Sequence, residues 1–315
     1  MGGTLFGRDL VAIGDLGRKG IEDVLNNASK MLSILEQGKR VDYLKNNIMA
    51  TLFFEPSTRT RLSFESAMQR LGGGVIGFAD ANTTSTIKGE TLADTVRIVE
   101  SYSDILVVRH NWVGAAREAA KYAKVPVING GDGAGEHPTQ ALLDLFTIKK
   151  EAGKLNKLKV VIAGDLKYGR TSHSFAEALS LFGNEFAFVA PNELQIPDNV
   201  YKSVEKNSGN VQKSESLSKV AADADVIYMT RVQKERLPKP EDYQKFEHAF
   251  KIDEKFMKSA KEDVILMHPL PRVNEISPEV DKLKNSVYFK QAGYGIPIRM
   301  AVLDMILNGD KRTAW

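Results

Sequence analysis

The chain has 315 residues, of which 43% are hydrophobic and 26% are charged. A chain of this length and composition can bury two moderate cores, so we expect two domains. The formal net charge of +3 is too small, and the lysines are too scattered, to indicate a nucleic-acid partner. Because the sequence contains no cysteine, disulfide bonds, thiolate metal sites and a cysteine nucleophile are excluded.

The apolar runs are too short to cross a membrane. The longest, such as Ile48–Phe54 and Ile105–Val108, fall far below the roughly 20 residues that a membrane helix needs. The first residues lack the basic segment, apolar stretch and small-residue cleavage site of a secretory signal. We therefore expect a cytoplasmic protein that does not span a membrane.

In the first half, short apolar runs alternate with segments of helical period, which is the pattern of an α/β protein. A helix is expected where Phe64, Met68 and Leu71 share one face, and a run of glycines from Gly72 marks its end. A second helix begins near Glu90. The strands expected in this half are Ile48–Phe54, Val75–Phe78 and Ile105–Val108.

The second half repeats the pattern after the charged segment Glu151–Lys159, where we place a domain boundary. The last helix, at about Ile298–Leu307, has an apolar face that we expect to dock back on the first domain. The elements expected between them are strands at Lys159–Ala163, Glu185–Val189, Val226–Met229 and Val264–Met267 and helices at Ser172–Phe182 and Leu217–Ala222.

The pattern thus predicts an α/β fold of two doubly wound domains, each with a mostly parallel sheet flanked by helices. The first domain comprises residues 1–150 and 292–315, and the second comprises residues 151–291. Ligands of open α/β sheets bind at the carboxyl ends of the strands. The polar residues that follow the apolar runs are therefore the candidates for chemistry.

The strongest local signal is the run Ser57-Thr58-Arg59-Thr60-Arg61, which follows a buried strand and opens a helix. The unpaired N–H groups and positive dipole end of the helix attract an anion, and the hydroxyl and guanidinium groups add donors. The run lacks the glycine-rich loop and lysine of a nucleotide P-loop, which favours a small phosphate compound over ATP. The alternative is a helix cap beside a solvated arginine.

Two further segments of the first half carry candidate polar groups. Arg109 follows an expected strand. His137 and Gln140 are three residues apart at the start of an apolar helix, so they share one face. Together these groups could hold a carbonyl oxygen and an amide-like NH₂ group. The alternative for a histidine before a proline is a capping or packed side chain.

Two segments of the second half carry arginines after expected strands. The segment Gly164–Thr171 lacks the G-x-G-x-x-G spacing of a dinucleotide loop, and Arg170 in it suits a carboxylate better than a pyrophosphate. Arg231 and Gln233 could meet a second carboxylate. The alternative for the charged run around them is a solvated loop.

The turn His268-Pro269-Leu270-Pro271-Arg272 ends the last expected strand. Its two prolines have no N–H to donate, so their part of the backbone presents only carbonyl acceptors. Carbonyl acceptors suit a substrate NH₂ group. The same chemistry also allows a rigid turn with no role in binding.

These segments together resemble the aspartate/ornithine carbamoyltransferase family, and within it the aspartate-specific catalytic chains. Relatives that use ornithine typically have a cysteine in the turn that corresponds to His268–Pro271 and lack the Arg231 loop, whereas this chain has no cysteine. The resemblance spans roughly Leu5–Leu307. The matching motifs, in the family's order and spacing, are Phe54-Glu55-Pro56-Ser57-Thr58-Arg59-Thr60-Arg61, Lys88-Gly89-Glu90-Thr91-Leu92-Ala93-Asp94-Thr95, His137-Pro138-Thr139-Gln140, the Arg231 loop and His268-Pro269-Leu270-Pro271.

The resemblance implies transfer of the carbamoyl group of carbamoyl phosphate to L-aspartate, an early step of de novo pyrimidine biosynthesis. It implies an active site in the cleft between the two domains, without a metal or another cofactor. It also implies a homotrimer in which each site is shared between subunits. Regulatory chains are further candidate partners.

The resemblance also assigns roles to individual residues. The phosphate would be bound by Ser57, Thr58, Arg59 and Thr60, and Arg109 would bridge the phosphate and the carbonyl group. The carbonyl oxygen would be polarised by Thr60, Arg109 and His137, and the carbamoyl NH₂ would be held by Gln140 and the backbone carbonyls of Pro269 and Leu270. The α-carboxylate of aspartate would pair with Arg170, beside Thr171, its side-chain carboxylate would pair with Arg231 and Gln233, and Lys88 would reach the site of a neighbouring subunit.

One segment departs from the family pattern. The loop before Lys88 usually supplies a serine to the neighbour's phosphate, and this chain has Thr84 four residues upstream of Lys88, followed by Ser85. Either hydroxyl could serve. Two other functions stay open, namely a small-anion or dinucleotide-binding protein on the same scaffold and a carbamoyltransferase for another amino acid.

Overall fold

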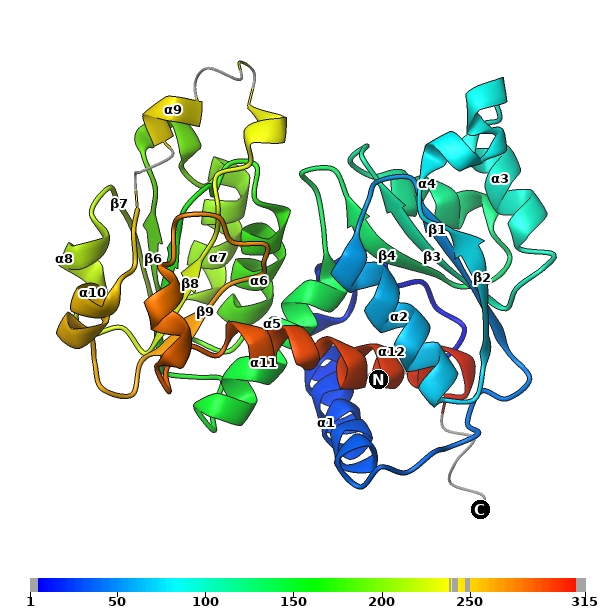
Figure 1. Ribbon diagram of the computed structural model, residues 1–315, viewed down its shortest axis with the longest axis horizontal. Coiled ribbons are helices and arrows are strands. Elements are labelled where there is room, and N and C mark those ends of the chain that lie inside the picture. The colour runs from blue at the N-terminus through cyan, green and yellow to red at the C-terminus, as the bar shows by residue number, and fades with distance from the viewer. Residues whose placement is uncertain (1–4, 238, 240–242, 247–249, 310–315) are drawn as a thin grey trace. The chain divides into compact units, whose positions relative to one another are not determined.

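The apolar runs of the first half form a parallel sheet in the computed structural model of the chain (Figure 1). The structure describes residues 5–237, 239, 243–246 and 250–309. It divides into two compact units: unit 1 is the described part of Met1–Phe146 with Tyr294–Trp315, and unit 2 is that of Thr147–Gly293. The first division falls within helix α5 (Pro138–Glu151), rather than in the charged segment that follows this helix.

Within the described residues of unit 1, four strands pair in parallel in the order β2-β1-β3-β4. β3 and β4 are buried along their whole length, as is typical of parallel strands covered on both faces. β2, at one edge, is partly exposed. The strands are β1 (Ile48–Phe53), β2 (Gly74–Phe78), β3 (Ile105–His110) and β4 (Val127–Asp132).

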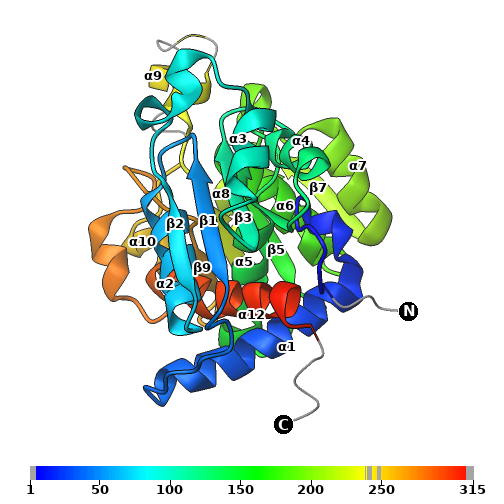
Figure 2. The same ribbon diagram turned by 90° about the vertical axis from the view of Figure 1, so that its right-hand side faces the viewer.

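Helices cover both faces of this sheet (Figures 1 and 2). On one face, α3 and α4 pack Val96, Ala116 and Ala119 against alternate strand residues such as Ala50 and Leu52. On the other face lie α2 and α12, with α1 packed on α12. The helices are α1 (Gly17–Glu36), α2 (Thr58–Arg70), α3 (Leu92–Val99), α4 (Ala115–Tyr122), the start of α5 and α12 (Gly295–Leu307), with short 3₁₀ turns η1 (Ile13–Asp15), η2 (Ala81–Thr83) and η3 (Ser85–Lys88).

Helix α12 completes unit 1 although the whole of unit 2 separates it in sequence from the rest of that unit. It is buried along almost its whole length. A helix with no wide polar face belongs in a core, and α12 contacts both α1 and α2. The last helix of the described residues therefore packs on the first, α1.

Within the described residues of unit 2, five strands pair in parallel in the order β7-β6-β5-β8-β9. Helices α8, α10 and α11 contribute to the apolar core on one face, and α6 packs beside α7. The strands are β5 (Lys159–Ala163), β6 (Glu185–Val189), β7 (Asn210–Ser214), β8 (Val226–Met229) and β9 (Ile265–Met267); the helices are α6 (Arg170–Ser180), α7 (Asp198–Asn207), α8 (Leu217–Ala221), α9 (Tyr243–Phe246), α10 (Glu254–Ser259) and α11 (Tyr288–Gly293), with turns η4 (Asn192–Leu194), η5 (Lys234–Arg236) and η7 (Pro278–Lys282).

The predicted fold class is confirmed, because each unit is a parallel sheet flanked by helices. The apolar pattern does not predict β4 or β7, since β4 contains two glycines after only two apolar residues and β7 is polar and largely exposed. Two boundaries also differ. Arg109 lies within β3 rather than after it, and Arg170 is the first residue of α6.

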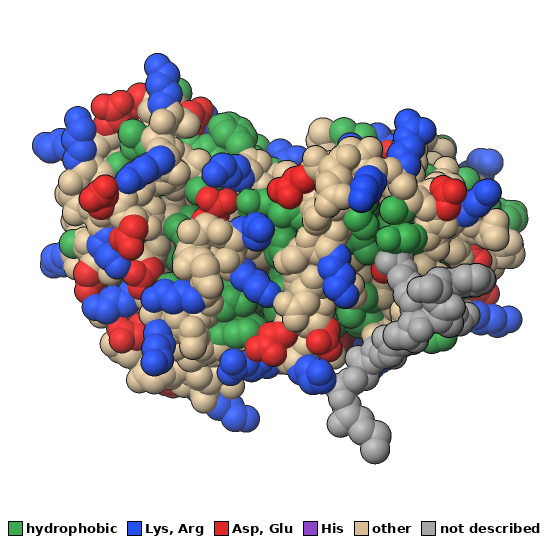
Figure 3. Space-filling model, turned by 90° about the horizontal axis from the view of Figure 1, so that it is seen from below, with side chains coloured by type: hydrophobic (Ala, Val, Ile, Leu, Met, Phe, Trp, Pro, Cys, Tyr) green, Lys and Arg blue, Asp and Glu red, His purple; other side chains and the backbone are tan. Residues whose placement is uncertain are grey.

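The surface carries both signs of charge. On the face drawn in Figure 3, Lys and Arg side chains are interspersed with Asp and Glu side chains, in keeping with the small net charge. In the part of the chain that the structure describes, the helices are too short or too polar to cross a bilayer.

Candidate active site

The phosphate-type run lies where β1 ends and α2 begins. Ser57 occupies the N-cap position with an extended backbone, but its side chain makes no capping hydrogen bond. This disfavours the capping alternative and leaves the first N–H groups of α2 for an anion. Thr58 and Arg59 are exposed, whereas Thr60 is buried.

A buried contact joins the start of α2 to the segment before α5. Thr60 Oγ1 lies 3.3 Å from His137 Nε2, and the two residues are only 6% and 4% exposed. The contact links positions 77 residues apart, so the fold, not the local sequence, brings the two motifs together. A hydroxyl and an imidazole thus lie side by side at the carboxyl edge of the unit 1 sheet.

The Arg109 guanidinium is fixed between the same two segments. Its Nη1 donates to the carbonyl of Gly130, in β4, at 3.1 Å. Its Nη2 lies 3.2 Å from Glu55 Oε2, just before the phosphate-type run. Arg109 is buried, and a cation held from two sides keeps its donors in a set direction.

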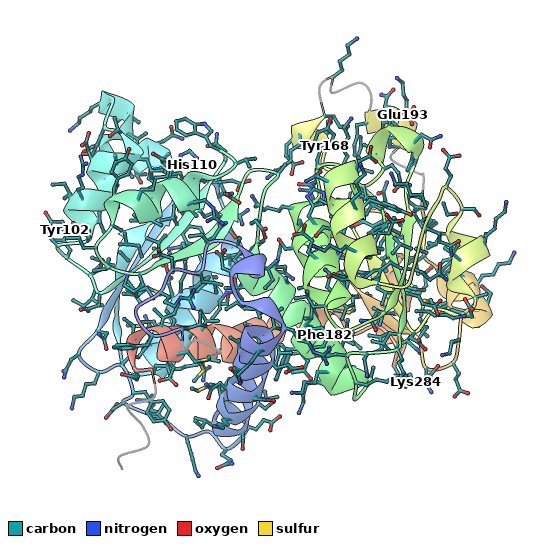
Figure 4. All side chains as sticks on the ribbon, turned by 180° about the vertical axis from the view of Figure 1, so that it is seen from behind. Tyr102, His110, Tyr168, Phe182, Glu193 and Lys284 are labelled. Carbon is teal, nitrogen blue, oxygen red and sulfur yellow. The ribbon has the colours of Figure 1, made fainter. Side chains whose placement is uncertain are left out.

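The loop that leads to His137 is held by backbone contacts to a buried carboxylate. Asp132 Oδ1 accepts from the N–H of Glu136 at 2.7 Å, and Oδ2 accepts from the N–H of Gly114 at 2.6 Å. His110, labelled in Figure 4 at the end of β3, packs against neighbouring aromatic rings, and burial lowers its pKa. These residues support the site from outside it.

Gln140 lies in the first turn of α5, one turn after His137. Its Nε2 donates to Asp144 Oδ1, one further turn along, at 2.8 Å. Gln140 is half-buried, whereas Asp144 is completely buried. The helix therefore gives the glutamine amide a fixed partner on the side of the core.

Lys88 ends the short turn η3 and is exposed. It makes no hydrogen bond or ion pair with any residue that the structure describes. The Thr84 hydroxyl is used within the loop, since it donates to the carbonyl of Ala81 at 2.7 Å and accepts from the N–H of Thr86. The Ser85 hydroxyl is exposed and has no such partner among the described residues. The loop thus presents a cation and a hydroxyl that the described residues of its own chain do not bind.

In unit 2, Asp165 ties together the two loops that carry arginines. Its Oδ1 accepts from the N–H of Tyr168 at 3.0 Å, and its Oδ2 accepts from the N–H of Gln233 at 3.1 Å. Burial raises the pKa of Asp165, although these donors oppose the shift. In Figure 4, Tyr168 is labelled just before α6 and Phe182 just after it. Buried Arg170 opens α6 directly after this loop.

Arg231 forms an ion pair with Glu235 through both terminal nitrogens. The hydrogen bond from Arg231 Nη1 to Glu235 Oε2 is 3.0 Å long, and this hydrogen bonding raises the pKa of Arg231. The Glu235 side chain is 54% exposed, so the pair is worth little and a ligand carboxylate can compete for the arginine. Gln233 and Thr171 are half-buried nearby in sequence.

The ring of His268 shapes the turn after β9. Its Nε2 lies 2.8 Å from Glu275 Oε1, and its Nδ1 accepts from the N–H of Leu270 at 2.8 Å. A ring that donates at Nε2 and accepts at Nδ1 is neutral, and burial indeed lowers the pKa of His268 in spite of Glu275. Since Pro269 and Pro271 have no N–H and that of Leu270 is used, the backbone of these three residues has only carbonyl groups left for a ligand.

The predicted residues therefore form two groups, one in each unit. In unit 2, β5, β8 and β9 are neighbours, so Arg170, Arg231 and the turn at Pro269 follow the same edge of the sheet. In the described residues, no group of three or more metal-ligating side chains is arranged to hold an ion.

Sequence reasoning missed the carboxylates that hold these groups. Glu55, Asp165 and Glu235 each fix a predicted binding loop or arginine, but an acidic residue in a loop carries no local mark of its partner. Asp144 could have been found, because it lies four residues after Gln140 on the same helix face.

Two family models match the chain. The model of the aspartate/ornithine carbamoyltransferase carbamoyl-P binding domain matches residues 8–150, and that of the Asp/Orn binding domain matches residues 156–306. The chain belongs to the aspartate/ornithine carbamoyltransferase family.

Relatives within the family carry the aspartate name. The aspartate carbamoyltransferase catalytic subunit of Methanothermobacter thermautotrophicus is 49% identical over 95% of this chain and 96% of its own length. That of Thermoplasma acidophilum is 50% identical over 96% of this chain and 99% of its own length.

Solved structures give the same result. The catalytic subunit of M. jannaschii aspartate transcarbamoylase superposes with a TM-score of 0.88 at 45% identity, over 96% of this chain and 99% of that one. Aspartate transcarbamoylase from Trypanosoma cruzi in complex with carbamoyl phosphate and aspartate gives a TM-score of 0.92 at 40% identity, over 96% and 98% of the two chains.

Proposed function

We propose that this chain transfers the carbamoyl group of carbamoyl phosphate to the amine of L-aspartate, which yields N-carbamoyl-L-aspartate and phosphate in pyrimidine biosynthesis. The observation that carries this proposal is the buried contact of Thr60 with His137, with Arg109 held between the same segments. The identities above 45% to aspartate carbamoyltransferase catalytic subunits support the choice of aspartate.

The phosphate binds at the start of α2. Ser57, Thr58, Arg59 and Thr60 supply hydroxyl, guanidinium and backbone N–H donors there, and the helix dipole favours the negative charge. The carbonyl oxygen is held by Thr60, Arg109 and His137. Donors aimed at this oxygen stabilise the tetrahedral oxyanion that forms when the amine attacks, and this stabilisation is worth several kcal/mol in total.

The carbamoyl NH₂ group donates to acceptors. These are the side-chain carbonyl of Gln140 and the backbone carbonyls of Pro269 and Leu270. The departing phosphate takes the proton of the attacking amine, because none of the described side chains assigned to the site is an obvious strong base.

Aspartate binds through its two carboxylates. Arg170, at the start of α6 beside Thr171, pairs with the α-carboxylate. Arg231 leaves Glu235 and, with Gln233, holds the side-chain carboxylate. Cations at both ends fix the amine relative to the carbamoyl carbon, which supplies positioning as well as charge balance.

The working form is a cytoplasmic homotrimer in which Lys88 and a hydroxyl of its loop serve the neighbouring subunit. The ammonium of Lys88, which is exposed and has no partner among the described residues, supports this arrangement. Ser85 is the better candidate for the hydroxyl, since that of Thr84 is used within its own loop. Apolar side chains that a contact between subunits could cover are exposed at Leu62, Ile76, Ile87, Ile98 and Tyr102.

A substrate panel tests the proposal. The purified chain is incubated with carbamoyl phosphate and, separately, with aspartate, glutamate, asparagine or ornithine, and both phosphate and the carbamoylated product are measured. Aspartate should be the best acceptor, because asparagine lacks the second carboxylate and glutamate is one methylene longer. A preference for ornithine, or phosphate release without a carbamoylated product, would contradict the proposal.

A further inference from the structure

A buried polar cluster lies behind the candidate site in unit 1. Thr139 and Asp144 are completely buried, and Arg299, in α12, is 3% exposed. Arg299 Nη2 donates to Thr139 Oγ1 at 3.4 Å, and its guanidinium lies 4.9 Å from the centre of the Phe64 ring. The guanidinium thus contacts α5, which carries Gln140 and directly follows His137, and α2, which carries Thr60.

The cluster places ionisable side chains in the core of unit 1, where charged residues are rare. Burial lowers the pKa of Arg299 to about 9, with Asp144 opposing the shift, so the group is still a cation at neutral pH. Buried charges are often no more stabilising than well-packed apolar side chains of similar volume. Stability alone therefore does not account for an arginine and an aspartate at these positions.

The aspartate settles which way the Gln140 amide faces. The donor is the Nε2 amide of Gln140, which lies 2.8 Å from Asp144 Oδ1. The side-chain oxygen of Gln140 consequently points elsewhere, and it accepts no hydrogen bond from a residue that the structure describes. Because Gln140 is half-buried, this oxygen is an acceptor open to a ligand.

We propose that Asp144 is a positioning residue that makes the site select carbamoyl phosphate over acyl phosphates without an NH₂ group. It fixes the Gln140 amide so that the oxygen, and not the nitrogen, meets the substrate's NH₂ group. This inference rests on the proposed function, since it assigns a specificity to the same site.

Acetyl phosphate, which has a methyl group where carbamoyl phosphate has NH₂, is the discriminating probe. Dissociation constants of both compounds are measured by calorimetry for the wild-type protein and for Asp144→Asn. The wild type should prefer carbamoyl phosphate by roughly tenfold, the value of one good hydrogen bond. In Asp144→Asn the new amide no longer dictates the orientation of Gln140, so the preference should fall to near unity while acetyl phosphate binds as before.

Asp304→Asn is the matched control. Asp304 is also buried and also accepts from a side-chain amide four residues along its helix, that of Asn308, at 2.9 Å. Its replacement should leave the preference at the wild-type value. In a Gln140→Ala background the preference should already be lost, and Asp144→Asn should change it no further, because the aspartate acts through the glutamine.

If Asp144→Asn does not fold, the inference can still be tested on the wild-type protein by hydrogen exchange. The side-chain amide protons of Gln140, identified by their loss in Gln140→Ala, should exchange with solvent at least about tenfold more slowly than those of exposed Gln69. The inference would be overturned if Gln140 and Gln69 exchanged their amide protons at equal rates. It would also be overturned if folded Asp144→Asn kept the preference for carbamoyl phosphate over acetyl phosphate, or if the wild type showed no such preference. Failure of the wild type to carbamoylate aspartate would instead overturn the proposed function.

Discussion

At the scale of single residues, His137 is the clearest test of the chemistry. The buried imidazole lies against Thr60 and is assigned to the developing oxyanion. His137→Ala should lower kcat by about 10²–10³, as loss of one preorganised donor does, with only a modest change in phosphate affinity. Steady-state kinetics and phosphate binding measure the two effects. Unchanged turnover would make His137 a packing residue.

Arg231 tests the choice of acceptor. Arg231→Ala should raise the aspartate KM and lower kcat, because loss of a charged pair from a closed site costs about 2–5 kcal/mol, while carbamoyl phosphate binding stays nearly intact. Arg18→Ala is the matched control, since Arg18 also pairs with a glutamate four residues on, Glu22, at 3.1 Å. Equal effects of the two substitutions on the aspartate KM would remove Arg231 from the site.

The sequence predicts the residues that meet substrate better than those that hold them. Ser57 to Thr60, Arg109 and Arg231 follow apolar runs and His137 precedes an apolar helix, and such positions are visible in sequence. Arg299 lies 155 residues after Asp144 inside an apolar helix, and nothing local marks the pair. Supporting contacts depend on which distant segments meet, and only the fold determines that.

At the scale of an element, the turn after β9 predicts a pH dependence. His268 is buried and neutral, with a pKa below its ordinary value of 6.5, so the unfolded chain binds more protons than the native chain just below pH 6.5. Stability is therefore complete above that pH and falls as the pH drops, by up to about 1.4 kcal/mol per pH unit for one group. Urea unfolding at several pH values measures the fall.

His268→Gln separates this contribution from others. A glutamine can donate to Glu275 but does not gain a proton, so the variant should lose less stability between pH 6.5 and pH 4.5. The pKa of His110 is also lowered by burial, and its contribution has the same sign, which is why the difference between variant and wild type is the relevant quantity. Parallel stability curves would show that His268 does not titrate on unfolding.

The close approach of β5 to the Arg231 loop gives a second test of an element. Gly164 has a φ of +119°, and a Cβ there would collide with the carbonyl oxygen of Thr230. Gly183 also has a positive φ, of +73°, but a Cβ there would meet nothing. Gly164→Ala should therefore lower the free energy of unfolding by about 1–3 kcal/mol more than Gly183→Ala, since it adds crowding to the shared strain. Equal losses in chemical denaturation would contradict the described contact.

Strands were predictable where they are buried and apolar, as β1, β5 and β8 are. β7 is hidden from such reasoning because its residues alternate between exposed and half-buried positions without an apolar run. The glycines of β4 serve close packing instead, since a Cβ at Gly130 would meet Val107 and Val108 of the neighbouring strand.

At the scale of the whole molecule, complementation tests whether subunits share sites. Lys88→Ala and His137→Ala proteins should each be nearly inactive. Dissociated together and reassociated, they should form trimers in which an intact Lys88 faces an intact His137, and activity should return to at most about one-third of the wild-type sites. If native mass spectrometry shows mixed trimers that stay inactive, Lys88 acts within its own chain. As a control, His137→Ala is reassociated with Lys124→Ala, a variant in which both Lys88 and His137 are intact. This mixture shows how much activity mixed trimers have when one of the two parent proteins is active.

The fold class could be predicted from the sequence because the alternation of strand and helix runs through both halves. The return of α12 to unit 1 was an expectation from its apolar character alone, and its partners α1 and α2 became known only from the structure. The sequence of a single apolar helix does not predict which helices it packs against.

The position of α12 has a consequence for the order in which the chain matures on the ribosome. Unit 2 is one continuous segment, so it can fold as soon as it has emerged, whereas unit 1 must wait for its last helix. Domains that are synthesised first usually fold first, and here the order is reversed. Until α12 has emerged, the apolar surfaces of α1 and α2 that it later covers are exposed on the nascent chain, and it is at this stage that the chain is most exposed to chaperones and to aggregation.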